Sequence, residues 1–124
     1  MTNYDPNNIF AKIIKGQIPC TKITENQDFL AFEDISKAAP IHILVIPKQQ
    51  FTSFEDFTQN ANPNLIVNFF KFITQITKDQ NIANGYRLIT NIGSDANQTV
   101  KHFHAHILAG KNLGGLLAND TLKR

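Results

Sequence analysis

The sequence predicts an α+β domain in which a roughly five-stranded antiparallel sheet packs against two main helices. Two patterns support this prediction. Helical apolar spacing twice follows a capping residue and a proline, at Asp5-Pro6 and at Asn62-Pro63. Short extended segments bounded by turn residues occupy much of the remaining chain. With 124 residues, 42% hydrophobic content and ten phenylalanines, the chain can bury one core, so we expect a single domain over residues 1–124.

The first half predicts one helix and three strands. Asp5-Pro6 is interpreted as an N-cap with proline in the first turn, and this helix ends at Gly16. Its apolar residues recur at helical spacing: Ile9, Phe10, Ile13 and Ile14. Segments 21–25, 28–33 and 42–46 predict strands of an antiparallel meander, and Pro47 closes the third.

The second half predicts a long helix after Asn62-Pro63 and two more strands. Residues 52–57 are expected to form one turn of helix, residues 86–91 a strand, residues 93–99 a loop and residues 103–108 the final strand. The apolar residues of the long helix cover more than one narrow stripe: Leu65, Ile66, Phe69, Phe70, Phe72, Ile73 and Ile76. Because one face can pack on the sheet and the surplus phenylalanines need another cover, we expect a homodimer through this helix and a sheet edge.

Composition narrows the class of partner and compartment. Twelve Lys and Arg against ten Asp and Glu is too even a balance for a protein whose main partner is nucleic acid. The single cysteine, Cys20, cannot form an internal disulfide, and the opening residues lack the features of a secretion signal. The longest strongly apolar stretch, near residues 41–46, is far shorter than the ~20 residues of a membrane-spanning helix. We therefore expect a soluble cytoplasmic protein.

Three of the four histidines alternate with apolar residues near the C-terminus. On a β-strand, residues two apart share a face, so His102, His104 and His106 would form a row while Phe103 and Ile107 face the core. The row could simply be the solvated face of a strand. A metal site is a second interpretation, but the outer two histidines would lie ~13 Å apart at ~3.3 Å per residue, so only two could ligate one ion. A third ligand would have to come from His42, Asp34 or Asp95.

The third interpretation makes the middle histidine a nucleophile or base. Neutral imidazole can attack phosphorus through one nitrogen when a hydrogen bond at the other fixes the tautomer. The preceding loop offers amide and hydroxyl donors suited to non-bridging phosphate oxygens: Asn91, Ser94, Gln98 and Thr99.

The run from His102 to Leu108 resembles the His-φ-His-φ-His-φ-φ signature of the histidine triad nucleotide hydrolases, where φ is apolar. The resemblance covers about residues 8–118 and includes segments 9–19, 31–36, 39–48 and 85–91. The ending Leu108-Ala109-Gly110-Lys111 is similar to the nucleoside phosphoramidase branch. The resemblance implies the histidine triad fold and a hydrolase that needs no metal or other cofactor.

The resemblance also implies residue roles. His104 would be the nucleophile that accepts a nucleoside monophosphate, His102 and His106 its proton and oxygen partners, and Thr99 would assist the leaving group. Asn91, Gln98 and Thr99 would contact the phosphate, and Asp34 the ribose hydroxyls. The remaining matches would form an apolar pocket around the purine base, although core packing is the commoner role for any one of them taken alone: Ile9, Phe10, Ile18, Phe32 and Ile35.

Three departures from the family pattern matter. Asn8 and Ala11 stand where some members carry a Cys-x-x-Cys pair, so a structural zinc is not expected. Gln50 replaces a histidine found in many members and removes a possible proton relay. Asn97 occupies a position that is often glycine, and asparagine tolerates the left-handed conformation that a tight loop requires.

The resulting expectation is a two-step cleavage of purine nucleoside phosphoramidates or aminoacyl adenylates, derivatives of AMP or GMP, through a nucleotidyl-histidine. A dinucleoside polyphosphate hydrolase or nucleotidyl transferase of the same fold is the first alternative. The transferase branch typically has proline between two histidines, whereas Phe103 and Ala105 occupy those places here. A nucleotide-binding scaffold protein is the alternative of another class.

Overall fold

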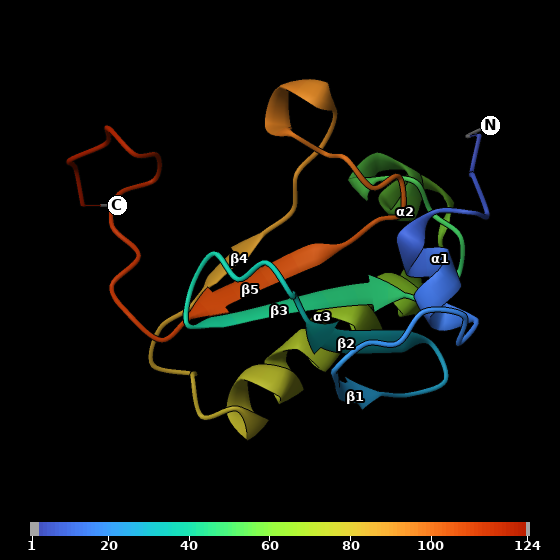
Figure 1. Ribbon diagram of the computed structural model, residues 1–124, viewed down its shortest axis with the longest axis horizontal. Helices are drawn as coiled ribbons and strands as arrows, with labels where there is room; N and C mark the ends of the chain where they lie inside the picture. The colour runs from blue at the N-terminus through green and yellow to red at the C-terminus, as the bar shows by residue number, and fades with distance from the viewer. Residues whose placement is uncertain (1–2, 124) are drawn as a thin grey trace.

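The computed structural model describes residues 3–123 and has one five-stranded antiparallel sheet with helices on both faces (Figure 1). Its strands are β1 (Lys22–Glu25), β2 (Phe29–Glu33), β3 (Ile41–Pro47), β4 (Arg87–Ile89) and β5 (Ala105–Ala109). They lie side by side in the order β1-β2-β3-β5-β4, and each neighbouring pair is antiparallel. The predicted fold class is therefore confirmed.

The helices are α1 (Ile9–Ile14), α2 (Phe54–Asn60) and α3 (Pro63–Asp79). Asn62 caps α3 and Pro63 occupies its first turn, as predicted. The cap predicted for α1 is wrong. Asp5 and Pro6 belong to a preceding turn, and the N-cap is Asn8, whose side chain accepts a hydrogen bond from the backbone of Ala11. The two positions where some family members carry cysteines thus form a helix cap here.

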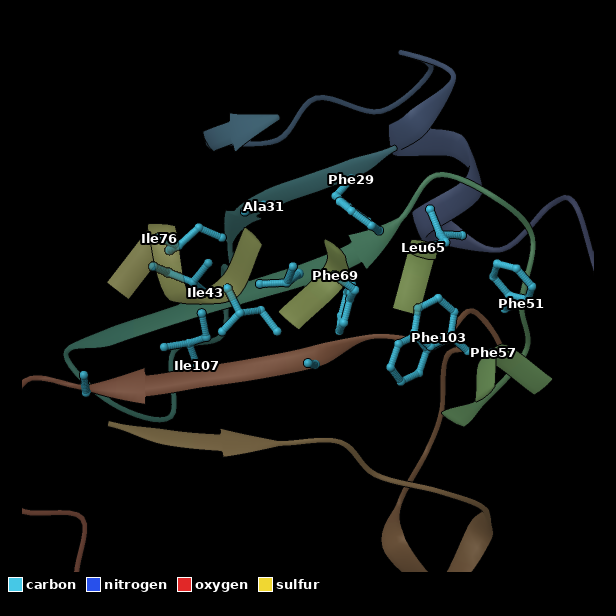
Figure 2. Packing of buried hydrophobic residues seen from close by; sticks show 14 of the residues in the cluster. Phe29, Ala31, Ile43, Phe51, Phe57, Leu65, Phe69, Ile76, Phe103 and Ile107 are labelled. Carbon is cyan, nitrogen blue, oxygen red and sulfur yellow. The ribbon is translucent and has the colours of Figure 1, made fainter. Parts of the chain in front are cut away.

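The main core lies between the sheet and α3. Phe69 and Ile73 of α3 pack against sheet residues such as Phe29 and Ile107 (Figure 2). The aromatic rings of Phe57 and Phe103 stack at the end of this core, with centroids 4.7 Å apart. Because alternate residues of a strand face opposite sides, the other face of the sheet carries a different set of side chains.

That second face is covered by α1. Phe10 of α1 packs with Phe32 and Leu44 in a smaller apolar cluster. The N-terminal helix therefore covers the face of the sheet opposite α3. The N-terminal segment therefore lies close to the side chains that β3 and β5 present on this second face of the sheet.

Two predicted boundaries are wrong in informative ways. The turn of helix expected over residues 52–57 is the seven-residue helix α2, because Ser53 caps its N-terminus and acidic residues occupy its first turn. The final strand begins at Ala105 instead of Phe103. Upstream of Ala105 the backbone has other partners: Phe103 N–H donates to the Phe51 carbonyl, and the His104 carbonyl accepts from the Thr90 hydroxyl.

The helices of residues 3–123 do not include one that combines the length and apolarity needed to cross a membrane.

Candidate active site

The three alternate histidines lie on the α1 side of the sheet. Phe103, Ala105 and Ile107 are buried in the main core on the α3 side, so the intervening histidines face the opposite way. The Phe10 ring packs edge to face against the His104 ring, with 4.9 Å between the ring centroids. The centroids of the His104 and His106 rings are 5.2 Å apart. The predicted row of imidazoles is confirmed, although His102 and His104 precede β5.

His102 is the most deeply buried histidine and has no exposed surface. Its Nε2 lies 2.8 Å from the carbonyl oxygen of Pro47, at the end of β3. Because a carbonyl can only accept, Nε2 carries the ring proton and Nδ1 keeps a lone pair. Nδ1 in turn accepts a hydrogen bond from the hydroxyl of Tyr4. Both ring nitrogens of His102 are thus engaged within the protein.

His104 is held in the tautomer that a nucleophile requires. Its Nδ1 donates to the backbone carbonyl of His102 at 2.7 Å, which leaves the lone pair on Nε2. His104 as a whole is 8% exposed, so a small part of its surface is open to solvent. Backbone support comes from the residue after β4, because the Thr90 hydroxyl donates to the His104 carbonyl at 2.9 Å.

His106 is paired with a fourth histidine, His42 of β3. Leu44 pairs with His106 and His42 with Leu108 in the β3–β5 register, so the two histidines are diagonal neighbours on one face. Nε2 of His42 lies 2.8 Å from Nδ1 of His106 and 3.4 Å from the Asp34 carboxylate.

The tautomers of this pair follow from the backbone. The Ala38 N–H donates to Nδ1 of His42, so the proton of the neutral His42 ring is on Nε2. His42 therefore donates to Nδ1 of His106, so the one ring proton of a neutral His106 is on Nε2.

Burial keeps all four imidazoles neutral at physiological pH. It is the main cause that lowers the pKa of His102 and of His106 to about 4, and each of the two is also disfavoured as a cation by the neighbouring His104. Burial likewise lowers the pKa of His104 and of His42, against an opposing effect of the Asp34 carboxylate on both. A neutral His104 has the Nε2 lone pair that attack on phosphorus needs.

Asp34, His42 and His106 are close enough together to be considered as metal ligands, since one ligand atom of each lies within 4.8 Å of the others. The hydrogen bonds of His42 instead favour a pair of hydrogen-bonded histidines over a metal site. To ligate a cation, Nε2 of His42 would have to transfer its proton to Nδ1, which would then face the Ala38 N–H donor.

The loop before the triad is ordered by Gln98, whose side chain is buried. Its amide nitrogen donates to the carbonyls of Thr52 and Val100 at 2.8 and 3.2 Å, and its amide oxygen accepts from Gly93 N–H. All these groups belong to the backbone, so the predicted phosphate ligand here joins the loop to the segment before α2. Asn97 adopts the left-handed conformation, with φ of 62°, as the sequence predicted.

The other predicted phosphate ligands, Thr99 and Asn91, also lie on the connection between β4 and β5. Thr99 is exposed and directly follows Gln98. Asn91 is half-buried and follows Thr90, whose hydroxyl contacts the His104 backbone.

An apolar cleft of about 270 Å³ opens beside the row, between α1 and the start of the β2–β3 connection. Asp34 lies at its rim, as does Ile35, which is 93% exposed. Every predicted residue of the base pocket contributes to its lining: Ile9, Phe10, Ile18, Phe32 and Ile35. A larger hollow of about 470 Å³ near Arg87 is formed by the C-terminal segment and shares no residue with the triad.

Three supporting residues were not predicted in these roles. The sequence suggests His42 only as a possible metal ligand, and it suggests no role for Tyr4 or Thr90. Their partners lie 64, 98 and 14 residues away along the chain. The β3–β5 register would have been needed to find His42, and local periodicity carries no signal for the other two.

Comparisons with known proteins agree with this geometry. The model of the family described as "Scavenger mRNA decapping enzyme C-term binding" matches residues 7–121. An uncharacterised 13.2 kDa HIT-like protein from Azospirillum brasilense is 44% identical over 115 residues, covering 92% of this chain and 94% of that protein.

Two solved structures are similar along most of their length. A histidine triad protein from Clostridium difficile superposes with a TM-score of 0.82 at 40% identity, covering 93% of this chain and 98% of that one. A HIT family hydrolase from Clostridium thermocellum superposes with a TM-score of 0.81 at 39% identity, covering 88% and 95%. The imidazole row, the sheet that carries it and these similarities lead to one conclusion: the chain belongs to the histidine triad (HIT) family.

Proposed function

We propose that this protein is a nucleoside phosphoramidase that cleaves the P–N bond of purine nucleoside phosphoramidates or aminoacyl adenylates. One observation carries the proposal: because Nδ1–H of His104 donates to the His102 carbonyl, the lone pair of the neutral ring is on Nε2, the nitrogen that can attack phosphorus. The hydrolase described for the similar Clostridium thermocellum structure supports the reaction class.

In the first step, Nε2 of His104 forms a bond to phosphorus as the bond between phosphorus and the leaving amine breaks. The departing amine takes up a proton from solvent, relayed by the Thr99 hydroxyl. In the second step, a water oxygen bonds to phosphorus as the bond from phosphorus to Nε2 of His104 breaks. The proton that this water loses returns to solvent through the same hydroxyl, and the nucleoside monophosphate and the neutral ring are released. The carbonyl of His102 accepts from Nδ1–H throughout and stabilises the cationic nucleotidyl-imidazolium.

The two flanking histidines take different parts. His102 has both ring nitrogens occupied, so it serves through its backbone carbonyl and its packing. His106 retains an Nε2–H that can donate to a non-bridging phosphate oxygen or to the leaving atom. His42 supports that proton from behind, because it donates to Nδ1 of His106.

The cleft supports a nucleoside as the bound group. Its lining is mainly apolar and holds the flat face of a purine, and the Asp34 carboxylate at the rim accepts from ribose hydroxyls. Asn91 contacts the phosphate, while Gln98 shapes the loop that presents Thr99. AMP and GMP derivatives both meet these requirements.

Mass spectrometry during turnover tests the proposal. Wild-type protein is mixed with adenosine 5′-phosphoramidate in the presence of a chelator and quenched in acid-free conditions. The expected result is a mass increase of one nucleotidyl group on the peptide that contains His104, and its absence in His104→Ala. Unchanged turnover by His104→Ala would contradict the nucleophile. Faster hydrolysis of a dinucleoside polyphosphate would favour the other leaving-group class, and binding without turnover a scaffold.

We also propose that the protein forms a homodimer through α3 and the β4 edge of the sheet. Val67 and Phe70 of α3 are 51% and 44% exposed, and Leu88 of the three-residue edge strand β4 is 42% exposed. Leu88 pairs with Ile107, so it faces the α3 side. Light scattering should report a dimer for wild type and a monomer for Val67→Glu with Phe70→Glu. Gln59→Glu on α2 adds a charge elsewhere and should remain dimeric, whereas a monomeric wild type would contradict the proposal.

A further inference from the structure

Tyr4, in the segment before α1, contacts the triad from the other end of the chain. Its hydroxyl bonds Nδ1 of His102, 98 residues later, and its ring meets the His102 ring edge to face with centroids 5.5 Å apart. Because Nε2 of His102 donates to the Pro47 carbonyl, Nδ1 is an acceptor and the Tyr4 hydroxyl must be the donor. The direction of this hydrogen bond is therefore determined by the backbone.

The hydroxyl matters because the acceptor it satisfies is fully buried. His102 has no exposed surface, and Tyr4 is the partner that the described residues supply to its Nδ1. A buried acceptor without a donor is costly, and here the ring could relieve that cost by turning, by admitting water or by taking a proton. The first two changes would displace the His102 ring, and the third would make it cationic.

The backbone of His102 is the support of the nucleophile. The carbonyl of His102 accepts a hydrogen bond from Nδ1–H of His104, with 2.7 Å between the two heavy atoms. If His102 were displaced, the ring proton of His104 would no longer be fixed on Nδ1. The Phe10 ring packs edge to face against both imidazoles, and its centroid lies 6.3 Å from that of His102 and 4.9 Å from that of His104. Tyr4 thus lies at the start of a continuous series of contacts that ends at the Nε2 lone pair.

We propose that Tyr4 is a positioning residue whose hydroxyl holds His102 as a neutral, fixed ring and thereby keeps His104 oriented for attack. This inference rests on the proposed function only where it concerns turnover, because the state of the His102 ring exists without substrate.

The Tyr4 hydroxyl also opposes protonation of the His102 ring. A donor on the Nδ1 lone pair occupies the position that a proton would take, and burial already lowers the pKa of His102 to about 4. A cationic His102 would repel the nucleotidyl-imidazolium that forms on His104. The ionisable groups around the Tyr4–His102 contact come from every neighbouring element: Tyr4 itself, Asp5, Lys15, Lys48 and His104.

The decisive variant is Tyr4→Phe, which keeps the ring packing and removes the hydroxyl. We expect kcat/KM to fall about tenfold, as for loss of a donor to a buried acceptor, and the acid limb of its pH profile to move to higher pH. Tyr86→Phe, in the only other tyrosine of the chain, should leave both unchanged. A purely structural role of the Tyr4 ring predicts wild-type behaviour for Tyr4→Phe, and that result would overturn the proposal.

Nitrogen-15 NMR of the histidine rings provides a test without turnover. Wild-type His102 should be protonated at Nε2, with Nδ1 hydrogen-bonded, and Tyr4→Phe should shift Nδ1 toward the value of a free lone pair. An unchanged Nδ1 resonance would refute the Tyr4 contact even if the enzyme is active. Conversely, a shifted Nδ1 in a protein that cleaves no phosphoramidate would retain the contact and reject the proposed function. If Tyr4→Phe folds poorly, a slowly exchanging Tyr4 hydroxyl proton coupled to Nδ1 in wild type decides the same question.

Discussion

Nε2 of His42 donates a hydrogen bond to Nδ1 of His106 across 2.8 Å, and the backbone of Ala38 fixes the direction of that bond. The pair joins β3 to β5 on the α1 face of the sheet. It leaves His106 with Nδ1 as an acceptor within the protein and with its ring proton on Nε2. The three alternate histidines are therefore joined by a fourth on the same face of the sheet.

Replacing His42 should expose this dependence. In His42→Ala, Nδ1 of His106 loses its donor, so we expect kcat to fall about 100-fold with a small change in KM, in the range of a lost acid–base partner. His42→Gln, which can still donate through its side-chain amide, should retain more activity than His42→Ala. Equal activity of His42→Ala and wild type in steady-state kinetics would show that His106 acts without this support.

Stability should rise with pH between about 4 and 6.5. The pKa of His102 and of His106 is lowered to about 4 in the folded protein, while unfolded histidine titrates near 6.5. In this window the unfolded chain binds more protons, so each ring lowers the free energy of unfolding by about 1.4 kcal/mol per pH unit of acidification. Urea unfolding at pH 7, 6 and 5 measures the slope.

The variant His106→Gln supplies the control for this slope. It removes one of the two strongly shifted rings, so its stability should depend on pH less steeply, by about 1.4 kcal/mol per unit. An identical slope in wild type and His106→Gln would mean that His106 is not held neutral by folding.

Gln98 should matter for folding before it matters for substrate. Its amide bridges Thr52, Val100 and Gly93, so Gln98→Ala leaves buried backbone groups without partners at a cost of ~1–3 kcal/mol. Gln98→Glu is nearly isosteric but points a carboxylate at two carbonyls, and should be the less stable variant. Thermal unfolding without ligand measures both. Wild-type stability with a raised KM would instead identify Gln98 as a phosphate ligand.

Thr90 should contribute through the backbone of the nucleophile. Thr90→Val keeps the side-chain shape and removes the donor to the His104 carbonyl. We expect kcat/KM to fall about fivefold, equivalent to ~1 kcal/mol for one hydrogen bond. The matched change Thr58→Val removes an exposed hydroxyl that donates to the Glu55 carbonyl on α2, and should leave kcat/KM unchanged. Equal rates for wild type and Thr90→Val would refute this role.

Several features follow from local sequence because their causes are local. Alternation of polar and apolar residues along an extended segment places His102, His104 and His106 on one side, since a strand repeats every two residues. Asn62-Pro63 begins α3 because an N–H in the first turn of a helix has no acceptor within the helix. Proline has no N–H, so it loses no hydrogen bond at this position. The same signature misled at Asp5-Pro6, where Asn8 competes as the cap and forms its bond to Ala11.

Other features depend on contacts between distant segments, so no local pattern carries a signal for them. The register of β3 against β5 brings His42 to His106, and a shift of one residue would move His42 to the other face of the sheet. The segment before α1 brings Tyr4 to the His102 ring, and Thr90, directly after β4, reaches the His104 backbone. The sequence alone determined which face carries the imidazoles, whereas the fold determined which nitrogen of each ring holds its proton, because hydrogen-bond partners come from wherever the chain returns.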